Sequence, residues 1–133
     1  MTSAELKYLI ATDEIYDGIN GVKLIDIAAK VGVSKVSVYR AVERLEKNFY
    51  VERNEKNKVV LTEYGKKQLS YYREIMNFLQ NHLIKQCGTP EDVAYNDALG
   101  VACAFSDISR EKIADILRSG TCLCAQQTAE IND

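Results

Sequence analysis

The segment KLIDIAAKVGVSKVSVYRAVERLEK, residues 23–47, restricts the fold more than any other part of the sequence. Its first third, KLIDIAAK, places apolar side chains at helical spacing and predicts a short helix with one buried face. The next residues, VGVS, predict a tight turn at Gly32, with Ser34 placed to cap a second helix that runs to residue 47. Two helices joined by so short a glycine turn are typical of a helix-turn-helix unit.

The second helix of this pair has two different faces. Val38, Val42 and Leu45 recur at i, i+4 and i+7 and predict a buried stripe. The other face carries mainly polar and basic side chains, namely Ser34, Lys35, Ser37, Tyr39, Arg40 and Arg44. Because the major groove of DNA admits one helix, this face predicts DNA contacts, with a small serine allowing close approach and basic side chains reaching guanine edges or phosphates.

A basic hairpin follows the helix pair. The run YVERNEKNKVVL alternates as two short strands, at about 50–54 and 58–61, joined by a polar turn. Arg53, Lys56 and Lys58 of this hairpin suit contacts with phosphates or the minor groove. The order of these elements predicts a DNA-binding winged helix-turn-helix, and a winged helix used only for protein contacts is the alternative.

Helices account for the rest of the sequence. A first helix is expected at residues 4–16, Thr62 should cap a long helix that runs to about residue 86, and Pro90 should take the first position of the next. A last helix is expected at about 109–118. The sequence thus predicts a mainly α fold with a winged helix-turn-helix DNA-binding domain at 1–62, a helical dimerisation domain at 63–120 and a flexible cysteine-containing tail at 121–133.

Charge is distributed unevenly along the chain. Residues 34–67 hold nine Lys or Arg and five Glu, a net of +4, so the remaining residues sum to −6 within the total of −2. A basic third in an acidic chain favours one face for a polyanion, although solvated helix faces of mixed charge would give the same count. The sequence has no apolar signal core and no run of about 18 apolar residues, which indicates a cytoplasmic protein without a membrane partner and with reduced cysteines.

The run IDIAAKVGVSKVSVYRAVERLEKNFYVERNEKNKVVLTEYGKK, followed by a long helix and YNDALGVACAFS, resembles the diphtheria-toxin-repressor and manganese-transport-repressor family of metal-dependent bacterial repressors. The resemblance covers about residues 4–117 and implies a repressor that dimerises behind its wing and binds palindromic operators in duplex DNA when iron or manganese is loaded. The helix in YNDALGVACAFS is apolar on nearly every side, which also favours a homodimer. The predicted interface residues are Leu99, Ala102 and Phe105.

The chain departs from this family at the metal-binding positions. The residues that match them are Lys7, Ile10, Tyr72, Leu99, Ala102 and Cys103. Only Cys103 is a convincing donor, and one thiol among aliphatic side chains cannot complete a coordination shell for Mn²⁺ or Fe²⁺. The site is therefore expected to be filled by packing, with Cys103 as a small buried hydrophobe.

The other cysteines leave a second kind of effector open. Cys87 lies at the end of the long helix, and Cys122 and Cys124 can return toward it, so these three thiols can hold a soft metal or an iron–sulfur cluster. Cys103 would lie roughly 20 Å from Cys87 along its helix. An unligated tail is the plain alternative, and the nearby His82 is expected to be a surface residue. The cofactor stays open between iron or manganese as the resemblance implies, a thiolate-bound metal or cluster, and none.

Enzymatic motifs are not found. The sequence lacks a phosphate loop, a G-x-S-x-G elbow and H-E-x-x-H, and its one histidine, His82, would have to serve any Cys-His pair. The spacing Cys122-x-Cys124 is a weak signal for a thiol oxidoreductase. We therefore expect a sequence-specific transcriptional regulator rather than an enzyme, with a thiol- or soft-metal-responsive regulator as the alternative.

Overall fold

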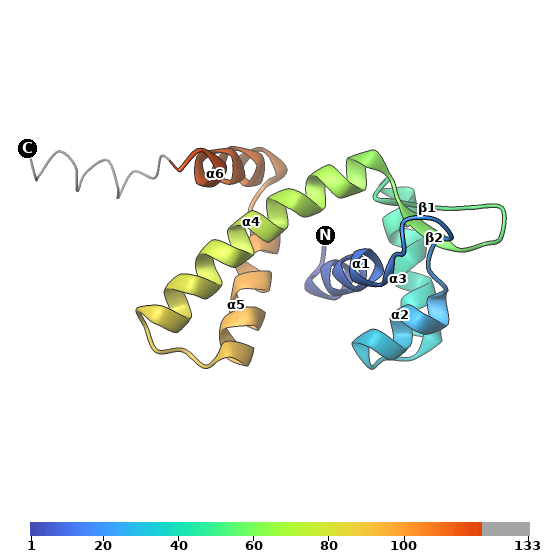
Figure 1. The fold of residues 1–133 in the computed structure, drawn as a ribbon, viewed down its shortest axis with the longest axis horizontal. Coiled ribbons are helices and arrows are strands. Elements are labelled where there is room, and N and C mark those ends of the chain that lie inside the picture. The colour runs from blue at the N-terminus through green and yellow to red at the C-terminus, as the bar shows by residue number, and fades with distance from the viewer. Residues whose placement is uncertain (121–133) are drawn as a thin grey trace, which may run out of the picture. The chain divides into compact units, whose positions relative to one another are not determined.

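Helices make up most of the chain in the computed structural model, which describes residues 1–120, so the predicted mainly α fold is confirmed (Figure 1). The elements are α1 (Ser3–Ile15), α2 (Leu24–Val31), α3 (Lys35–Lys47), β1 (Val51–Arg53), β2 (Val59–Leu61), α4 (Glu63–Lys85), α5 (Glu91–Ala104) and α6 (Asp107–Ser119). They form two compact units, residues 1–69 and residues 70 onward. Cys122 and Cys124, with the rest of the predicted tail, lie outside the described residues. Within residues 1–120, no helix combines the length and the apolar character needed to span a membrane.

The turn between α2 and α3 depends on its glycine. Gly32 has a φ of +82°, a left-handed conformation that glycine adopts without the strain of a Cβ atom. Its N–H donates to the Ala28 carbonyl at 2.8 Å and so closes α2. Ser34 then caps α3, because its side chain accepts a hydrogen bond from the Ser37 N–H at 3.2 Å. The predicted stripe on α3 is confirmed, since Val38, Val42 and Leu45 are all buried.

The wing is a small antiparallel sheet. Val51 of β1 lies opposite Leu61 of β2, and Arg53 lies opposite Val59. Val22, two residues before α2, adds a bridge to Val59 through two N–H···O bonds of 2.8 Å. This bridge fixes the wing to the start of the helix pair. At the tip, the Asn54 side chain accepts hydrogen bonds from the N–H groups of residues 56 and 58, at 3.0 Å each.

The first turn of α4 is anchored to the base of the wing. Thr62 caps the helix as predicted, because its Oγ1 accepts from the Gly65 N–H at 2.9 Å. The Thr62 N–H in turn donates to the Tyr50 carbonyl at 3.1 Å. Gly65 lies directly against that carbonyl, and a Cβ atom at this position would be 1.9 Å from the oxygen. Glycine is therefore required here for the start of α4 to approach the backbone before β1.

The second unit consists of the rest of α4 together with α5 and α6. Its tightest packing occurs at small residues, since Ala94, Ala98, Ala102 and Ala114 are completely buried. Two predicted helix starts need correction. Pro90 is the N-cap of α5 rather than its first helical residue, and α6 begins at 107 rather than 109 because the Ser106 side chain caps it.

Candidate nucleic-acid interface

The outer face of α3 carries most of the side chains predicted to contact DNA. Lys35, Ser37 and Arg40 are exposed, and Tyr39 is 44% exposed. The hydroxyls of Ser34 and Ser37 bond to each other at 2.9 Å, so these two serines stabilise the first turn of the helix. Among the described residues, neither Lys35 nor Arg40 takes part in an ion pair. These two long cationic side chains are therefore available to a polyanion.

Arg44 is held from within the first unit. Its Nε donates to Glu5 Oε1 at 2.7 Å, and Glu5 is only 6% exposed. The other carboxylate oxygen of Glu5 accepts from the Thr2 N–H at 3.2 Å, which completes the capping box of α1. Arg44 thus joins α3 to α1. A guanidinium has further N–H groups, so the same side chain can still reach a phosphate.

Arg53 links the wing to α3 in a similar way. Its guanidinium carbon lies 5.2 Å from the centroid of the Tyr39 ring, within the range of a cation–π contact. Its Nη1 also donates to Asn57 Oδ1 at 3.3 Å. Lys56 is exposed and Lys58 is half-buried. The predicted wing residues therefore divide into an arginine that orients the wing and two lysines that belong to its tip.

Val36 belongs to the same outer face and was not predicted. Its side chain is 61% exposed between Lys35 and Ser37. The sequence contained the signal, because Val36 and Arg40 are four residues apart, on the side away from the buried stripe that begins at Val38. An exposed valine in the major groove suits contact with the methyl group of thymine.

The side chains at the positions matched to the family's metal ligands do not supply a set of donors for manganese or iron. Ile10, Tyr72, Leu99 and Ala102 are buried, and the three aliphatic side chains offer no lone pair to a metal. Lys7, which is half-buried, carries an ammonium group. Hard divalent cations require several carboxylate, carbonyl or imidazole donors, so this set of residues does not fit them. Within residues 1–120, no group of three or more His, Cys, Asp or Glu side chains is placed to hold a metal ion.

A buried guanidinium lies beside Tyr72. Arg110 is 2% exposed, and its guanidinium carbon is 4.0 Å from the centroid of the Tyr72 ring. Its Nε donates to the Ala102 carbonyl at 3.0 Å, its Nη2 donates to the Phe105 carbonyl, and its Nη1 donates to Asp107 Oδ1 at 2.7 Å. These carbonyls end α5, where a positive charge is favourable. A fixed cation next to two of the matched positions further disfavours a divalent metal there.

The described cysteines are separate residues without a disulfide. Cys87 is exposed. Cys103 was predicted to be buried, and it is only partly buried. The reason is its place on α5: the buried side of this helix runs through Ala98, Leu99 and Ala102, and Cys103 lies at the edge of that side. The predicted site of Cys87 with Cys122 and Cys124 includes two residues outside the described part of the chain.

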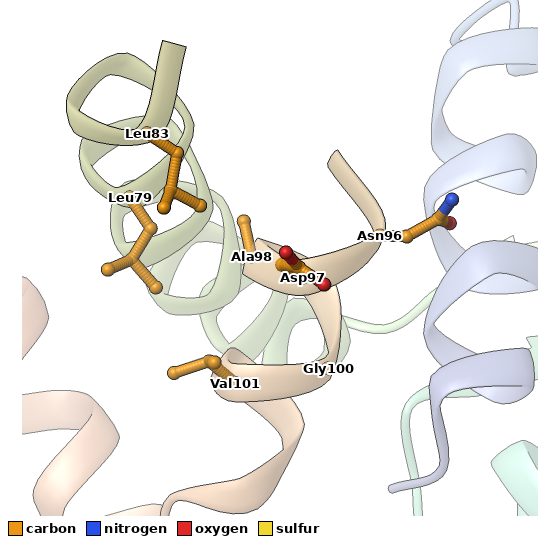
Figure 2. A pocket seen from close by; sticks show the side chains of 7 residues that line it. All are labelled: Leu79, Leu83, Asn96, Asp97, Ala98, Gly100 and Val101. Carbon is orange, nitrogen blue, oxygen red and sulfur yellow. The ribbon is translucent and has the colours of Figure 1, made fainter. Parts of the chain in front are cut away.

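An apolar groove of about 530 Å³ lies between α4 and α5 in the second unit. Figure 2 shows Leu79 and Leu83 of α4 on one side and Val101 of α5 on the other. Asn96 and Asp97 also line the groove. Both leucines are only half-buried, and Val101 is 43% exposed.

The predicted interface residues lie elsewhere. Leu99 and Ala102 are 1% and 0% exposed in the single chain, because they occupy the inner side of α5. Their side chains are therefore not accessible to a second subunit. Phe105, which follows α5, is half-buried. Leu79, Leu83 and Val101 contribute accessible apolar surface to this hairpin, as do the exposed Phe78 and Val93.

Comparison with known proteins gives a likeness of fold. No protein-family model and no curated protein sequence matches the chain. The hypothetical protein SSo2273 from Sulfolobus solfataricus is similar in structure, with a TM-score of 0.65 and 21% identity over 90% of this chain and 88% of that one. The manganese regulator SloR has a TM-score of 0.70 and 21% identity over 89% of this chain and 55% of its own.

A manganese-dependent transcriptional repressor in complex with manganese is also similar, with a TM-score of 0.62 and 20% identity over 92% of this chain and 54% of its own. The chain thus spans little more than half the length of each of these two regulators. At about one identical residue in five, the likeness concerns the backbone. The chain therefore shares the fold of the part of these two regulators that it covers.

Proposed function

We propose that this chain is a sequence-specific DNA-binding transcriptional regulator that acts as a homodimer. The observation that carries the proposal is the outer face of α3, where Lys35, Val36 and Arg40 are exposed beside a short polar first turn. Within residues 1–120, neither of the two cations has an ion-pair partner. A helix of this kind fits the major groove, and the wing adds Lys56 and Lys58 for the sugar–phosphate backbone. The fold shared with solved transcriptional regulators supports the same function.

A homodimer is supported by the groove between α4 and α5. Its half-buried leucines and Val101 offer an apolar surface that a second copy can cover, since exposed apolar patches are typical of protein–protein interfaces. Two winged helices related by a twofold axis would read a palindromic operator, with half-sites one or more helical turns apart.

Control by iron or manganese at the matched positions is not part of the proposal. Ile10, Leu99 and Ala102 cannot bind a metal, and the Arg110 guanidinium lies next to Tyr72. The effector, where there is one, acts elsewhere, and a soft metal, a cluster or oxidation at the thiols is the second candidate. A regulator of this kind would change its operator affinity when a ligand binds its two states unequally.

The test begins with duplexes retained by the full chain from a randomised pool. Arg40→Gln should reduce the preference for the selected duplex over random duplex, because a contact with a base edge is lost. Lys56→Gln should weaken binding to both duplexes to a similar extent, and the salt slope should fall by about one unit for each phosphate contact that is lost. Retention of no preferred duplex, or an equal loss of specificity in both variants, would contradict the proposal.

The effector is tested with the same duplex. Affinity of the metal-free, reduced protein is compared with that after addition of Mn²⁺, Fe²⁺ or Zn²⁺ and after mild oxidation, with a Cys122→Ser, Cys124→Ser double variant alongside. No response to Mn²⁺ or Fe²⁺ is expected at the matched positions. A strong requirement for either metal that persists in the double variant would show that the ligand argument is wrong.

A further inference from the structure

A hollow whose charged side chains are all cationic lies at the edge of the outer face of α3. It has a volume of about 290 Å³ and is lined by Lys23, Leu24, Ile25, Lys35, Lys56, Asn57 and Lys58. These residues come from the start of α2, the start of α3 and the tip of the wing, all within the first unit. A water molecule occupies about 30 Å³, so the hollow has room for a phosphodiester group with part of its hydration shell.

The electrostatics of this hollow are unfavourable without an anion. Four lysines line it and no acidic residue does. Among the described residues, none of the four forms an ion pair, in contrast to Lys30 on the same helix α2, whose Nζ lies 3.9 Å from Glu14. Asp26 in the first turn of α2 does not line the hollow. Like charges gathered around one concave site destabilise the free protein and attract an anion.

Lys23 strengthens this argument because of where it lies. It is the N-cap residue of α2, and its side chain makes no capping hydrogen bond. The N-terminus of a helix carries a partial positive charge, so a lysine is an unsuitable cap unless an anion is bound nearby. The unfavourable residue, the uncapped helix and the three other lysines all meet at the same hollow.

We infer that this hollow is a seat for a single backbone phosphate of the bound DNA, with Lys23 as a further DNA-binding residue. The inference rests on the proposed function. It also separates the roles of two neighbours on α3. Lys35 lines the hollow and binds the phosphate, whereas Arg40 does not line it and is left to contact base edges. The phosphate contact fixes the register of α3 in the groove, and Arg40 reads sequence in that register.

The first experiment uses salt dependence. The probe is the tightest duplex that the full chain retains from a randomised pool, and the variants are Lys23→Gln, Lys35→Gln, Lys58→Gln and the triple combination. Because one phosphate contact contributes a slope of about one unit and Lys56 still lines the hollow, the triple variant should lose at most about one unit in total and at most about fivefold in affinity at ~0.15 M salt. Three lysines on three separate phosphates would lose about three units. Lys30→Gln is the matched control and should change neither quantity.

The second experiment locates the phosphate. In ethylation interference, one linkage per half-site should become less sensitive to ethylation in the triple variant than in the wild-type chain, while interference at the other linkages remains. An unchanged interference pattern, or a loss of about three slope units in the triple variant, overturns the phosphate seat and leaves DNA binding itself standing. Failure of the wild-type chain to bind any duplex overturns the proposed function and the seat together.

Discussion

Gly65→Ala is the substitution for which the structure gives the clearest expected cost. The new Cβ atom would lie 1.9 Å from the Tyr50 oxygen and 2.8 Å from its carbonyl carbon, and both are backbone atoms that cannot rotate away. Overpacking of this kind costs about 3 kcal/mol at the upper end of its usual range. Moving the Tyr50 carbonyl also strains its hydrogen bonds from the Thr62 N–H at 3.1 Å and Oγ1 at 3.2 Å, which adds about 1–2 kcal/mol. The better helix propensity of alanine offsets about 1 kcal/mol, so the net loss is about 3–4 kcal/mol.

The matched control for this substitution is Gly100→Ala. Gly100 also lies inside a helix, but a Cβ atom there would meet no heavy atom within 4 Å in the chain. Alanine at this position should therefore raise the free energy of unfolding by up to about 1 kcal/mol. Urea unfolding followed by far-ultraviolet circular dichroism, at two protein concentrations, measures both variants and separates self-association from folding. A Gly65→Ala variant as stable as the wild type would refute the close approach of α4 to Tyr50.

Three further predictions test other parts of the structure. Phe49→Gly should raise the free energy of unfolding by about 0.5–1 kcal/mol in the same assay, because Phe49 has a φ of +65° and its ring is 74% exposed. Arg110→Met should lower it by about 2–4 kcal/mol, since two carbonyls at the end of α5 lose their donors, whereas Asp107→Asn should change it by less than about 1 kcal/mol because Asp107 is exposed. Val101→Glu should separate the subunits of the proposed dimer in sedimentation velocity and leave the helical content intact. Leu99→Glu should instead unfold the second unit, because Leu99 is buried. A dimer that persists with Val101→Glu would exclude the groove as the interface.

Local signals in the sequence were sufficient for the helix-turn-helix and the wing. Gly32, Ser34 and the Thr62 cap on Gly65 each act through hydrogen bonds between residues no more than four positions apart, so their effect can be read from neighbouring residues, whereas the bonds from Thr62 to Tyr50 depend on the hairpin. The stripe on α3 follows from helical spacing in the same way. The position of Gly65 against Tyr50 could not be predicted, because the contact depends on how the chain returns from the hairpin.

The candidate interface was predictable by residue type and less so by role. Basic residues on α3 and the wing could be counted, but the partner of Arg44 is Glu5, 39 positions earlier in the sequence. The contact of Arg53 with Tyr39 likewise depends on the fold. The count of basic residues in 34–67 therefore overestimates the charge available to DNA, because it includes these two arginines, which already have partners within the chain. The same count leaves out Lys23, which precedes residue 34. Lys23 lies near the wing lysines because the Val22–Val59 bridge brings the wing to the start of α2.

The matched metal positions illustrate the limit of reasoning from aligned residues alone. Their side chains predicted the loss of a ligand set, and the interior positions of Leu99 and Ala102 agree with packing. The matched residues gave no indication of Arg110. This residue comes from α6 and bonds to the carbonyl of Ala102 rather than to any side chain at a matched position. Its guanidinium neutralises the end of α5 and stacks on Tyr72, so the second unit has a permanent cation. A divalent ion at Tyr72 and Ala102 would first have to displace this cation from three hydrogen bonds, which link the end of α5 to the first turn of α6.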